Sequence, residues 1–204
     1  TFWEDAIVAL LGGPAHHRRA TECLAELKRQ ELISSRPGGR FPGEREYGFR
    51  HGLVRDAAYS MLTKSDLRLG HRLAATWLER AGENDAAVLA EHYDRGGQPS
   101  RALRWFERAA EQALEGHDFA TTIRRAAQGI GVATKGTTRG RLFLQQAEAH
   151  RWRGEFREGA TTAGEAIKQS PEGSAQWFRA VDELMTCSGR LGEFESTIGW
   201  AEIF

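Results

Sequence analysis

A glycine recurs at a fixed interval in the second half of the chain. Gly116, Gly154 and Gly192 are 38 residues apart, and a phenylalanine follows each of them within three residues. An interval of this length is typical of arrays of helical hairpins, in which each unit buries its apolar face only by stacking on its neighbour. No other feature of the sequence constrains the fold as strongly.

The residues around Gly154 resemble the tetratricopeptide pattern, in which small residues let two helices pack closely and a glycine makes the turn between them. The matching positions are Phe143, Ala147, Phe156, Ala163, Ala166 and Pro171. A second set around Gly97 comprises Leu89, Ala90, Tyr93, Ala102, Phe106 and Ala109. Gly192 aligns Phe194 and Ala201 before the sequence ends.

The unit at Gly116 matches this pattern less well. Phe119 is displaced by one residue, and Arg125 takes a position where an apolar residue is expected. Breaks between short helical patterns are expected at Gly116–Asp118, Gly129–Gly140, Gly154–Glu155, Ser170–Gly173 and Gly189–Gly192. Short helices with short turns imply antiparallel neighbours. We therefore expect a degenerate α-solenoid, and the alternative is an ordinary helical domain with coincidental glycines.

Residues 1–63 mix helical and extended patterns. Helices are expected over Phe2–Leu11 and His17–Glu31, where apolar residues recur at helical spacing on either side of a Gly-Gly-Pro stop. Alternating residues then predict a two-stranded ribbon, Leu32–Ser35 with Glu46–Arg50, joined by a flexible tip rich in Gly and Pro. A helix over Gly52–Leu62 completes the segment. Elements in this order are consistent with a small winged-helix-like unit.

From Thr63 onward the pattern is entirely helical. A long amphipathic helix runs to Gly82, with Ser65 or Asp66 as its N-cap, and a short helix follows from Asp85. The expected organisation is a winged-helix-like unit at 1–63, a linking helix at 64–84 and truncated tetratricopeptide-like repeats at 85–204. The predicted fold class is mainly α: a winged-helix-like unit with a short β-hairpin, followed by a right-handed tetratricopeptide-like α-solenoid.

The charge balance and the cysteine content limit the partners and the cellular compartment that the sequence predicts. The 28 Lys and Arg residues balance the 28 Asp and Glu residues, so no global positive field attracts nucleic acid or anionic lipid. Cys23 and Cys187 lie in helical patterns with apolar or small neighbours that suit buried thiols in a reducing compartment. No stretch approaches the roughly 20 apolar residues that cross a bilayer. We expect a cytoplasmic protein without membrane contact and, from its ends at Thr1 and Phe204, a piece of a longer one.

Motifs for catalysis, cofactors and metals are absent from the sequence. No GxxxxGK[ST] run is present, and Gly129-Ile130-Gly131 lacks the third glycine of a dinucleotide fingerprint. There is no HExxH, and His71, His92 and His150 lie in amphipathic patterns where a half-buried packing role is commoner. No GxSxG or SxxK motif places a nucleophile. We expect no catalytic, cofactor-binding or metal-binding residues, and an enzyme is the least favoured interpretation.

A DNA-binding transcriptional regulator, which reads DNA with its winged helix, is the alternative function for this chain. Its second helix and ribbon carry Arg18, Arg19, Lys28, Arg29, Arg36, Arg40 and Arg45, where a winged helix touches phosphates. Residues 1–62 nevertheless hold nine Lys or Arg against eight Asp or Glu. Glu22, Glu26 and Glu31 on or near the same helix would repel phosphate. An interdomain role is therefore preferred.

One run resembles a known family. Residues 49–62, FRHGLVRDAAYSML, resemble the segment that closes the ATPase region of bacterial STAND-type (AAA-like) signalling proteins. HRLAATWLE at 71–79 and LAEHYDRGG at 89–97 are similar to the linker and first helical repeat of those proteins, especially of those fused to serine/threonine kinase or nucleotide-cyclase modules.

The resemblance implies a regulatory role. In that family a P-loop ATPase acts as a switch, a winged-helix element packs against it, and helical repeats sense or recruit a partner. The present chain has neither the P-loop nor any kinase motif, so ATPase and kinase activity are not implied for these residues. The implied role is the regulatory region of a multidomain signalling protein.

The leading hypothesis is therefore a protein-interaction module. An array of helix pairs presents its first helices along a concave groove that contacts an extended or helical partner. Candidate contact residues are Arg101, Arg104 and Arg108 on one helix, Arg141, Gln145, Glu148, Arg151 and Trp152 on a second, and Gln176, Trp177 and Arg179 on a third. The alternative for each is a solvated helix face, or inter-repeat packing for the tryptophans. The expected partners are a protein or peptide segment and the ATPase or kinase domain of the same protein.

Overall fold

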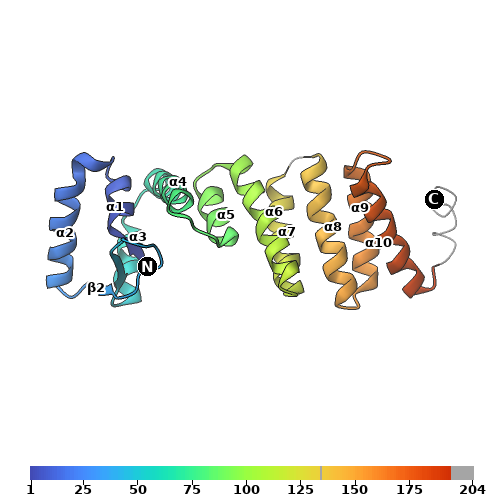
Figure 1. The fold of residues 1–204 in the computed structure, drawn as a ribbon, viewed down its shortest axis with the longest axis horizontal. Helices are drawn as coiled ribbons and strands as arrows, with labels where there is room; N and C mark the ends of the chain where they lie inside the picture. Colours follow the sequence, from blue (N-terminus) through green and yellow to red (C-terminus); the bar gives the residue numbers. More distant parts are fainter. Residues whose placement is uncertain (134, 194–204) are drawn as a thin grey trace. The chain divides into compact units, whose positions relative to one another are not determined.

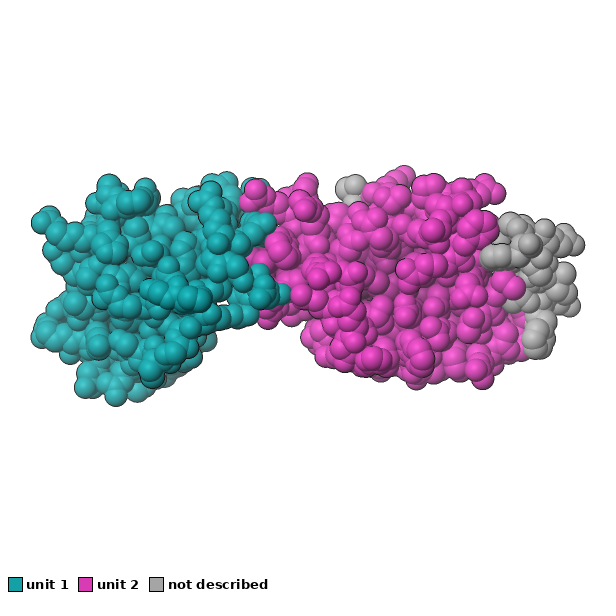
Figure 2. Space-filling model, viewed as in Figure 1, with its two compact units in different colours: residues 1–84, 91–98 teal, residues 85–90, 99–204 magenta. Residues whose placement is uncertain are grey.

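The computed structural model describes residues 1–133 and 135–193 and is mainly helical, with one small sheet (Figure 1). The mainly α fold class that the sequence predicts is thus confirmed. The chain divides into two compact units, coloured separately in Figure 2. Unit 1 comprises Thr1–Asn84 and Glu91–Gln98, and unit 2 comprises Asp85–Ala90 and Pro99–Phe204.

Unit 1 contains the sheet and the helices around it. Its elements are β1 (Phe2–Trp3), α1 (Glu4–Leu10), the short 3-10 helix η1 (Pro14–His16), α2 (His17–Arg29), β2 (Ile33–Arg36), β3 (Glu46–Phe49), α3 (Gly52–Ser60), α4 (Lys64–Ala81) and the end of α5 (Ala86–Arg95). The strands are antiparallel in the order β1-β3-β2. The predicted ribbon is confirmed as the β2–β3 pair. The helix predicted from Phe2 is wrong at its start, because Phe2 pairs with Tyr47 and only Glu4 begins the helix.

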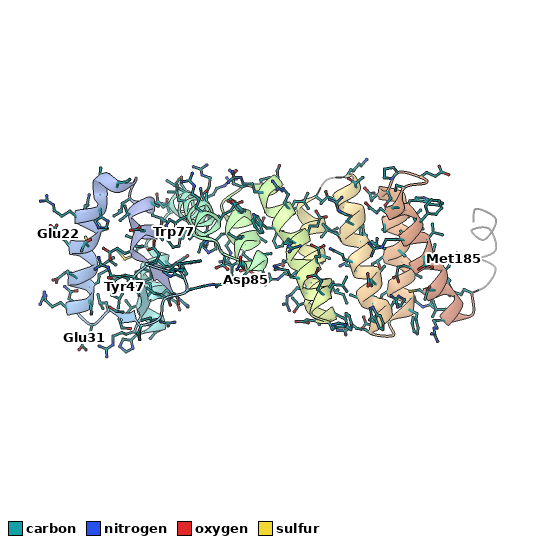
Figure 3. The ribbon with its side chains drawn as sticks, viewed as in Figure 1. Glu22, Glu31, Tyr47, Trp77, Asp85 and Met185 are labelled. Carbon is teal, nitrogen blue, oxygen red and sulfur yellow. The ribbon has the colours of Figure 1, made fainter. Side chains whose placement is uncertain are left out.

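The β2–β3 tip is held against the rest of unit 1. Phe41 is 5% exposed, and its ring packs 4.9 Å from Trp3 and 5.4 Å from Trp77, measured between centroids. Figure 3 shows the Trp77 side chain on α4. Arg40 donates a hydrogen bond to the buried carboxylate of Glu83. The flexible tip that the Gly and Pro content predicts is thus anchored by one aromatic cluster and one ion pair.

Helix α4 begins and ends with strong local signals. Thr63 is its N-cap: the Thr63 hydroxyl accepts from the Asp66 backbone N–H at 3.1 Å, and Asp66 accepts in return from the Thr63 backbone. The predicted caps Ser65 and Asp66 are therefore two and three residues too late. Gly82 ends the helix with φ +87°, a left-handed conformation that glycine adopts without strain.

Unit 2 is a series of antiparallel helices. After the start of α5, its elements are α6 (Pro99–Glu115), α7 (Phe119–Val132), α8 (Thr137–Trp152), α9 (Phe156–Gln169) and α10 (Ala175–Leu191). From α7 onward each helix packs against the one before it, and α8 also contacts both α6 and α10. Helices α6, α8 and α10 therefore line one side of the series, and α7 and α9 line the other (Figure 1).

Small residues let these helices approach closely. A Cβ at Gly129 would lie 2.8 Å from Leu142 and 3.1 Å from the Cβ of Phe106. A Cβ at Gly159 would lie 2.7 Å from the sulfur of Cys187. The break predicted over Gly129–Gly140 is consequently shorter than expected, because Gly129 is a packing position inside α7. Likewise, α10 continues through Gly189 to Leu191.

The two cysteines differ in environment. Cys187 is fully buried in α10, as the sequence predicts. Cys23 is exposed on α2, so its predicted burial is wrong: the buried stripe of that helix passes through Ala20 and Leu24 instead. Within the part of the chain described above, none of the helices combines the length and hydropathy that crossing a bilayer requires.

Candidate functional site

A cavity of about 450 Å³ opens on the side of unit 2 formed by α6, α8 and α10. It is lined by Glu107, Glu111, Leu114, Glu115, His117, Arg141, Leu144, Gln145, Glu148 and Arg179. We call this cavity the unit 2 groove. Four of the candidate contact residues lie in it, namely Arg141, Gln145, Glu148 and Arg179.

Helical spacing explains why these side chains meet. Glu107, Glu111 and Glu115 are four residues apart on α6 and therefore lie on one face of the helix. On α8, Arg141, Leu144, Gln145 and Glu148 follow an i, i+3, i+4, i+7 spacing and share one face as well. Because α8 contacts both α6 and α10, this face lies between the carboxylates of α6 and Arg179 of α10. The groove therefore presents polar side chains from three helices.

Ion pairs across the groove join the three helices. The Arg141 guanidinium donates two hydrogen bonds to the Glu107 carboxylate on α6, the second at 3.2 Å, and a third to the Thr138 hydroxyl. The bond to Glu107 raises the pKa of Arg141 above its ordinary value. Arg179 on α10 lies 3.6 Å from the Glu148 carboxylate. Both guanidinium groups of the groove are therefore already paired within the chain.

Two polar groups of the groove can still form an ion pair or a hydrogen bond with a partner. Among the described residues, Glu115 has no ion-pair partner, and its side chain lies at the exposed end of α6. The Gln145 Oε1 atom is shielded from solvent and accepts no hydrogen bond from the described residues. Buried acceptors in folded proteins are nearly always satisfied. Because this atom is shielded, a bound molecule can donate a hydrogen bond to it only after the Gln145 amide turns toward the groove, and that bond would then satisfy it.

Arg151 stabilises the array from outside the groove. Its guanidinium bonds to both carboxylate oxygens of Glu183 at 2.7 and 3.2 Å, which links α8 to α10. These hydrogen bonds raise the pKa of Arg151. Trp152, the next residue, is 58% exposed and its ring is stacked on Phe119 at 6.1 Å. Arg151 is therefore a packing residue, whereas Trp152 is accessible to a partner.

The other candidate residues do not line the groove. Trp177 is 5% exposed and packs within unit 2, and Gln176 donates hydrogen bonds to the Thr137 carbonyl and to Ser170. On α6, Arg101 and Arg104 are exposed, and Arg108 pairs with Glu111 at 2.7 Å. Sequence reasoning missed the other six residues of the lining, namely Glu107, Glu111, Leu114, Glu115, His117 and Leu144. The acidic i, i+4 spacing on α6 was the available signal, but it is equally common on solvated helices.

The described residues contain no group of three or more His, Cys, Asp or Glu side chains placed to hold a metal ion. The imidazoles of His71 and His92 lie in unit 1, with their Nδ1 atoms 3.2 Å apart. No third His, Cys, Asp or Glu among the described residues joins them to form a metal site.

Comparisons with known proteins give one short match. A stretch of 78 residues is 31% identical to a protein of Rhizobium meliloti (strain 1021) that is described as uncharacterized. The match covers 36% of this chain and 8% of that protein, so the chain spans a small part of its relative. No family model matches the chain. No solved structure matches it.

Proposed function

We propose that this chain is a non-catalytic, cytoplasmic protein-interaction and regulatory region of a multidomain bacterial signalling protein, and that its unit 2 groove binds a segment of a partner protein. The observation that carries the proposal is the cavity of about 450 Å³ across α6, α8 and α10. It combines an apolar floor, charged walls and an unsatisfied buried acceptor, as recognition grooves do.

A tetratricopeptide-like solenoid is the fold that we propose for unit 2. Ala147, Ala163 and Ala166 take the small-residue positions of the pattern, and all three are fully buried between helices. The turns after α6 and α8 each contain a left-handed residue two positions before a phenylalanine, namely His117 and Gly154. The third phenylalanine, Phe194, and Ala201 lie outside the described residues. Helix pairs stacked in this manner leave one side of the array open to a partner.

A winged-helix-like unit that packs on an ATPase switch is the role that we propose for unit 1. The order β1, α1, α2, β2, β3 and the sheet order β1-β3-β2 support this interpretation. Helix α3, which carries the resemblance to STAND-type proteins, has no buried residue. Leu53 on α3 and Met61 after it are each 84% exposed. Apolar side chains exposed in this way are suited to an interface with another domain.

DNA binding by unit 1 is the second candidate function, and the ion pairs disfavour it. Arg45 lies 2.9 Å from Glu4, a carboxylate that is 3% exposed, and Arg40 is bonded to the buried Glu83. A phosphate that drew these guanidiniums away would remove one partner from each of two buried carboxylates, which is unfavourable. Glu22 on the outer face of α2 would repel the phosphate backbone of DNA (Figure 3). An electrophoretic shift of duplex DNA at low salt would support DNA binding, and we expect none.

Site-specific photo-crosslinking tests the groove. A benzoylphenylalanine at position 179 lies on the exposed rim of the groove, and one at Thr161, exposed on α9, lies on the opposite side of the helix series. In extract of the source organism, we expect a discrete protein adduct from position 179 and none from position 161. Equal labelling from both positions, or none from either, contradicts a partner in the groove.

A further inference from the structure

The charges that line the unit 2 groove are unequal. Four carboxylates, those of Glu107, Glu111, Glu115 and Glu148, face two guanidiniums, those of Arg141 and Arg179. Arg141 is paired with Glu107, and Arg179 is paired with Glu148. Of the remaining carboxylates, Glu111 is paired with the exposed Arg108, and Glu115 has no ion-pair partner among the described residues. The surplus negative charge therefore lies where Glu111 and Glu115 form the last turn of α6.

The end of α6 adds to this negative potential. Its last turn contains no basic side chain, so the partial negative charge of the helix C-terminus is not offset by a neighbouring cation on the same helix. Carboxylates concentrated in a concave surface focus the field and raise the local concentration of cations. His117, the other titratable residue of the lining, packs edge-on against Phe119 with ring centroids 6.0 Å apart.

The uncharged lining favours the same kind of partner. Leu114 and the buried Leu144 supply an apolar surface on which the methylene stem of a lysine or arginine can pack. The unsatisfied Gln145 Oε1 needs a hydrogen-bond donor. Lysine and arginine side chains carry only donors, whereas aspartate and glutamate carry only acceptors when ionised. An acidic segment would meet both like charge and an acceptor that it cannot satisfy.

We propose that the unit 2 groove selects a basic polypeptide segment, whose Lys or Arg side chains lie against Glu111 and Glu115 and donate to Gln145. This inference rests on the proposed function and names the class of its partner. It differs from what the arginine-rich set of candidate residues alone suggests, which is an acidic partner. Because both groove arginines are paired with carboxylates of the chain, the charge that remains available to a partner is negative rather than positive.

A displayed library of random twelve-residue peptides tests the inference with the whole chain. Binders are selected on the chain and sorted by whether Gln145→Trp, which fills the groove, abolishes their binding. We expect groove-dependent binders to be enriched in Lys and Arg over the starting library. Groove-dependent binders that are acidic or uncharged would overturn the basic-segment inference while leaving the groove function intact. An absence of groove-dependent binders would contradict the proposed function itself, and the inference with it.

Charge-neutralising variants then test the position of the contact. For a selected basic peptide, we expect Glu111→Gln combined with Glu115→Gln to weaken binding about fivefold and to reduce its salt dependence, since both contacts are partly exposed. Glu158→Gln combined with Glu172→Gln also removes two exposed carboxylates, both outside the groove, and this matched control should leave the affinity unchanged. Equal effects of both changes would show a non-specific charge effect and overturn the assignment.

Discussion

At the scale of single residues, the turns of unit 2 depend on one backbone conformation. His117, Gly154 and Gly192 have φ values of +58°, +76° and +75°, and each ends a helix with two backbone hydrogen bonds to the preceding turn. Gly116 is not the left-handed residue of its turn. The 38-residue interval read from the glycines is therefore out of register by one residue at this turn, which explains the displacement of Phe119.

A pair of glycine substitutions tests this account of the turns. Gly154→Ala places a Cβ on a left-handed residue and should destabilise the chain by about 1 kcal/mol. Gly164→Ala is the matched control: it lies inside α9 in ordinary helical conformation, and its new Cβ meets nothing within 4 Å. It should stabilise the helix by up to about 1 kcal/mol. Urea unfolding measures both changes, and a loss of equal size in each variant would refute the conformational explanation.

Thiol reactivity should differ sharply between the two cysteines. Burial, and secondarily the Glu183 carboxylate, raise the pKa of Cys187 from 9.0 to about 11. The thiolate fraction at pH 8 is therefore about a hundredfold lower than for an unperturbed thiol. We expect iodoacetamide to label only Cys23 in the folded chain and both cysteines in urea, as read by mass spectrometry. Comparable labelling of Cys187 in the folded chain would show that its burial is misassigned.

At the scale of helices, packing distances decide which glycines are replaceable. Gly129 lies between Leu142 and Phe106, whereas Gly131, two residues later in α7, has open space around it. Gly129→Val should cost about 1–3 kcal/mol through overpacking, and Gly131→Val should be close to neutral. Thermal or urea unfolding distinguishes these outcomes. Similar stability of the two variants would mean that α7 does not pack as closely on α6 and α8 as described.

The pairing of α4 with the end of α5 in unit 1 should depend on pH. Burial lowers the pKa of both His71 and His92. The charges of His92 and Arg95 lower the pKa of His71 further. At His92 the charge of Arg95 also lowers the pKa, and the charge of Glu91 raises it. The unfolded chain, with histidine pKa near 6.5, therefore binds more protons than the folded chain around and below that pH. Stability should be fully present above about pH 7 and fall as the pH drops through 6.5.

Urea midpoints at pH 7.5 and 5.5 measure this dependence. The double variant His71→Gln, His92→Gln should lose less stability between the two pH values than the unmodified chain. A pH dependence that is identical in both proteins would exclude this pair as its source.

Most elements were predictable from the sequence, and the exceptions have local physical causes. The helical segments and the ribbon follow from periodicity and from Gly and Pro stops. The strand at Phe2–Trp3 was not predictable, because two residues have no readable period and become a strand only by pairing with β3. The anchoring of the β2–β3 tip was not predictable for a related reason: Phe41 packs on Trp3 and Trp77, which are distant from it in the sequence.

At the scale of the whole molecule, the groove was only partly predictable. Periodicity placed Arg141, Gln145, Glu148 and Arg179 on first helices, and the structure brings them together. Periodicity did not indicate that Arg141 pairs with Glu107, which lies 34 residues earlier on α6. It therefore could not give the sign of the charge that the groove leaves available to a partner. Pairing between helices depends on their registers, which a single sequence does not determine.

The central claim is that the groove formed by α6, α8 and α10 is where a polypeptide partner binds. NMR titration of the labelled chain with a groove-selected basic peptide tests it most directly. We predict that the side-chain amide of Gln145 and the backbone amides of Glu111 and Glu115 shift in proportion to bound peptide, while those of α7 and α9 on the opposite side stay unchanged. Shifts confined to unit 1, or to α7 and α9, would contradict the claim.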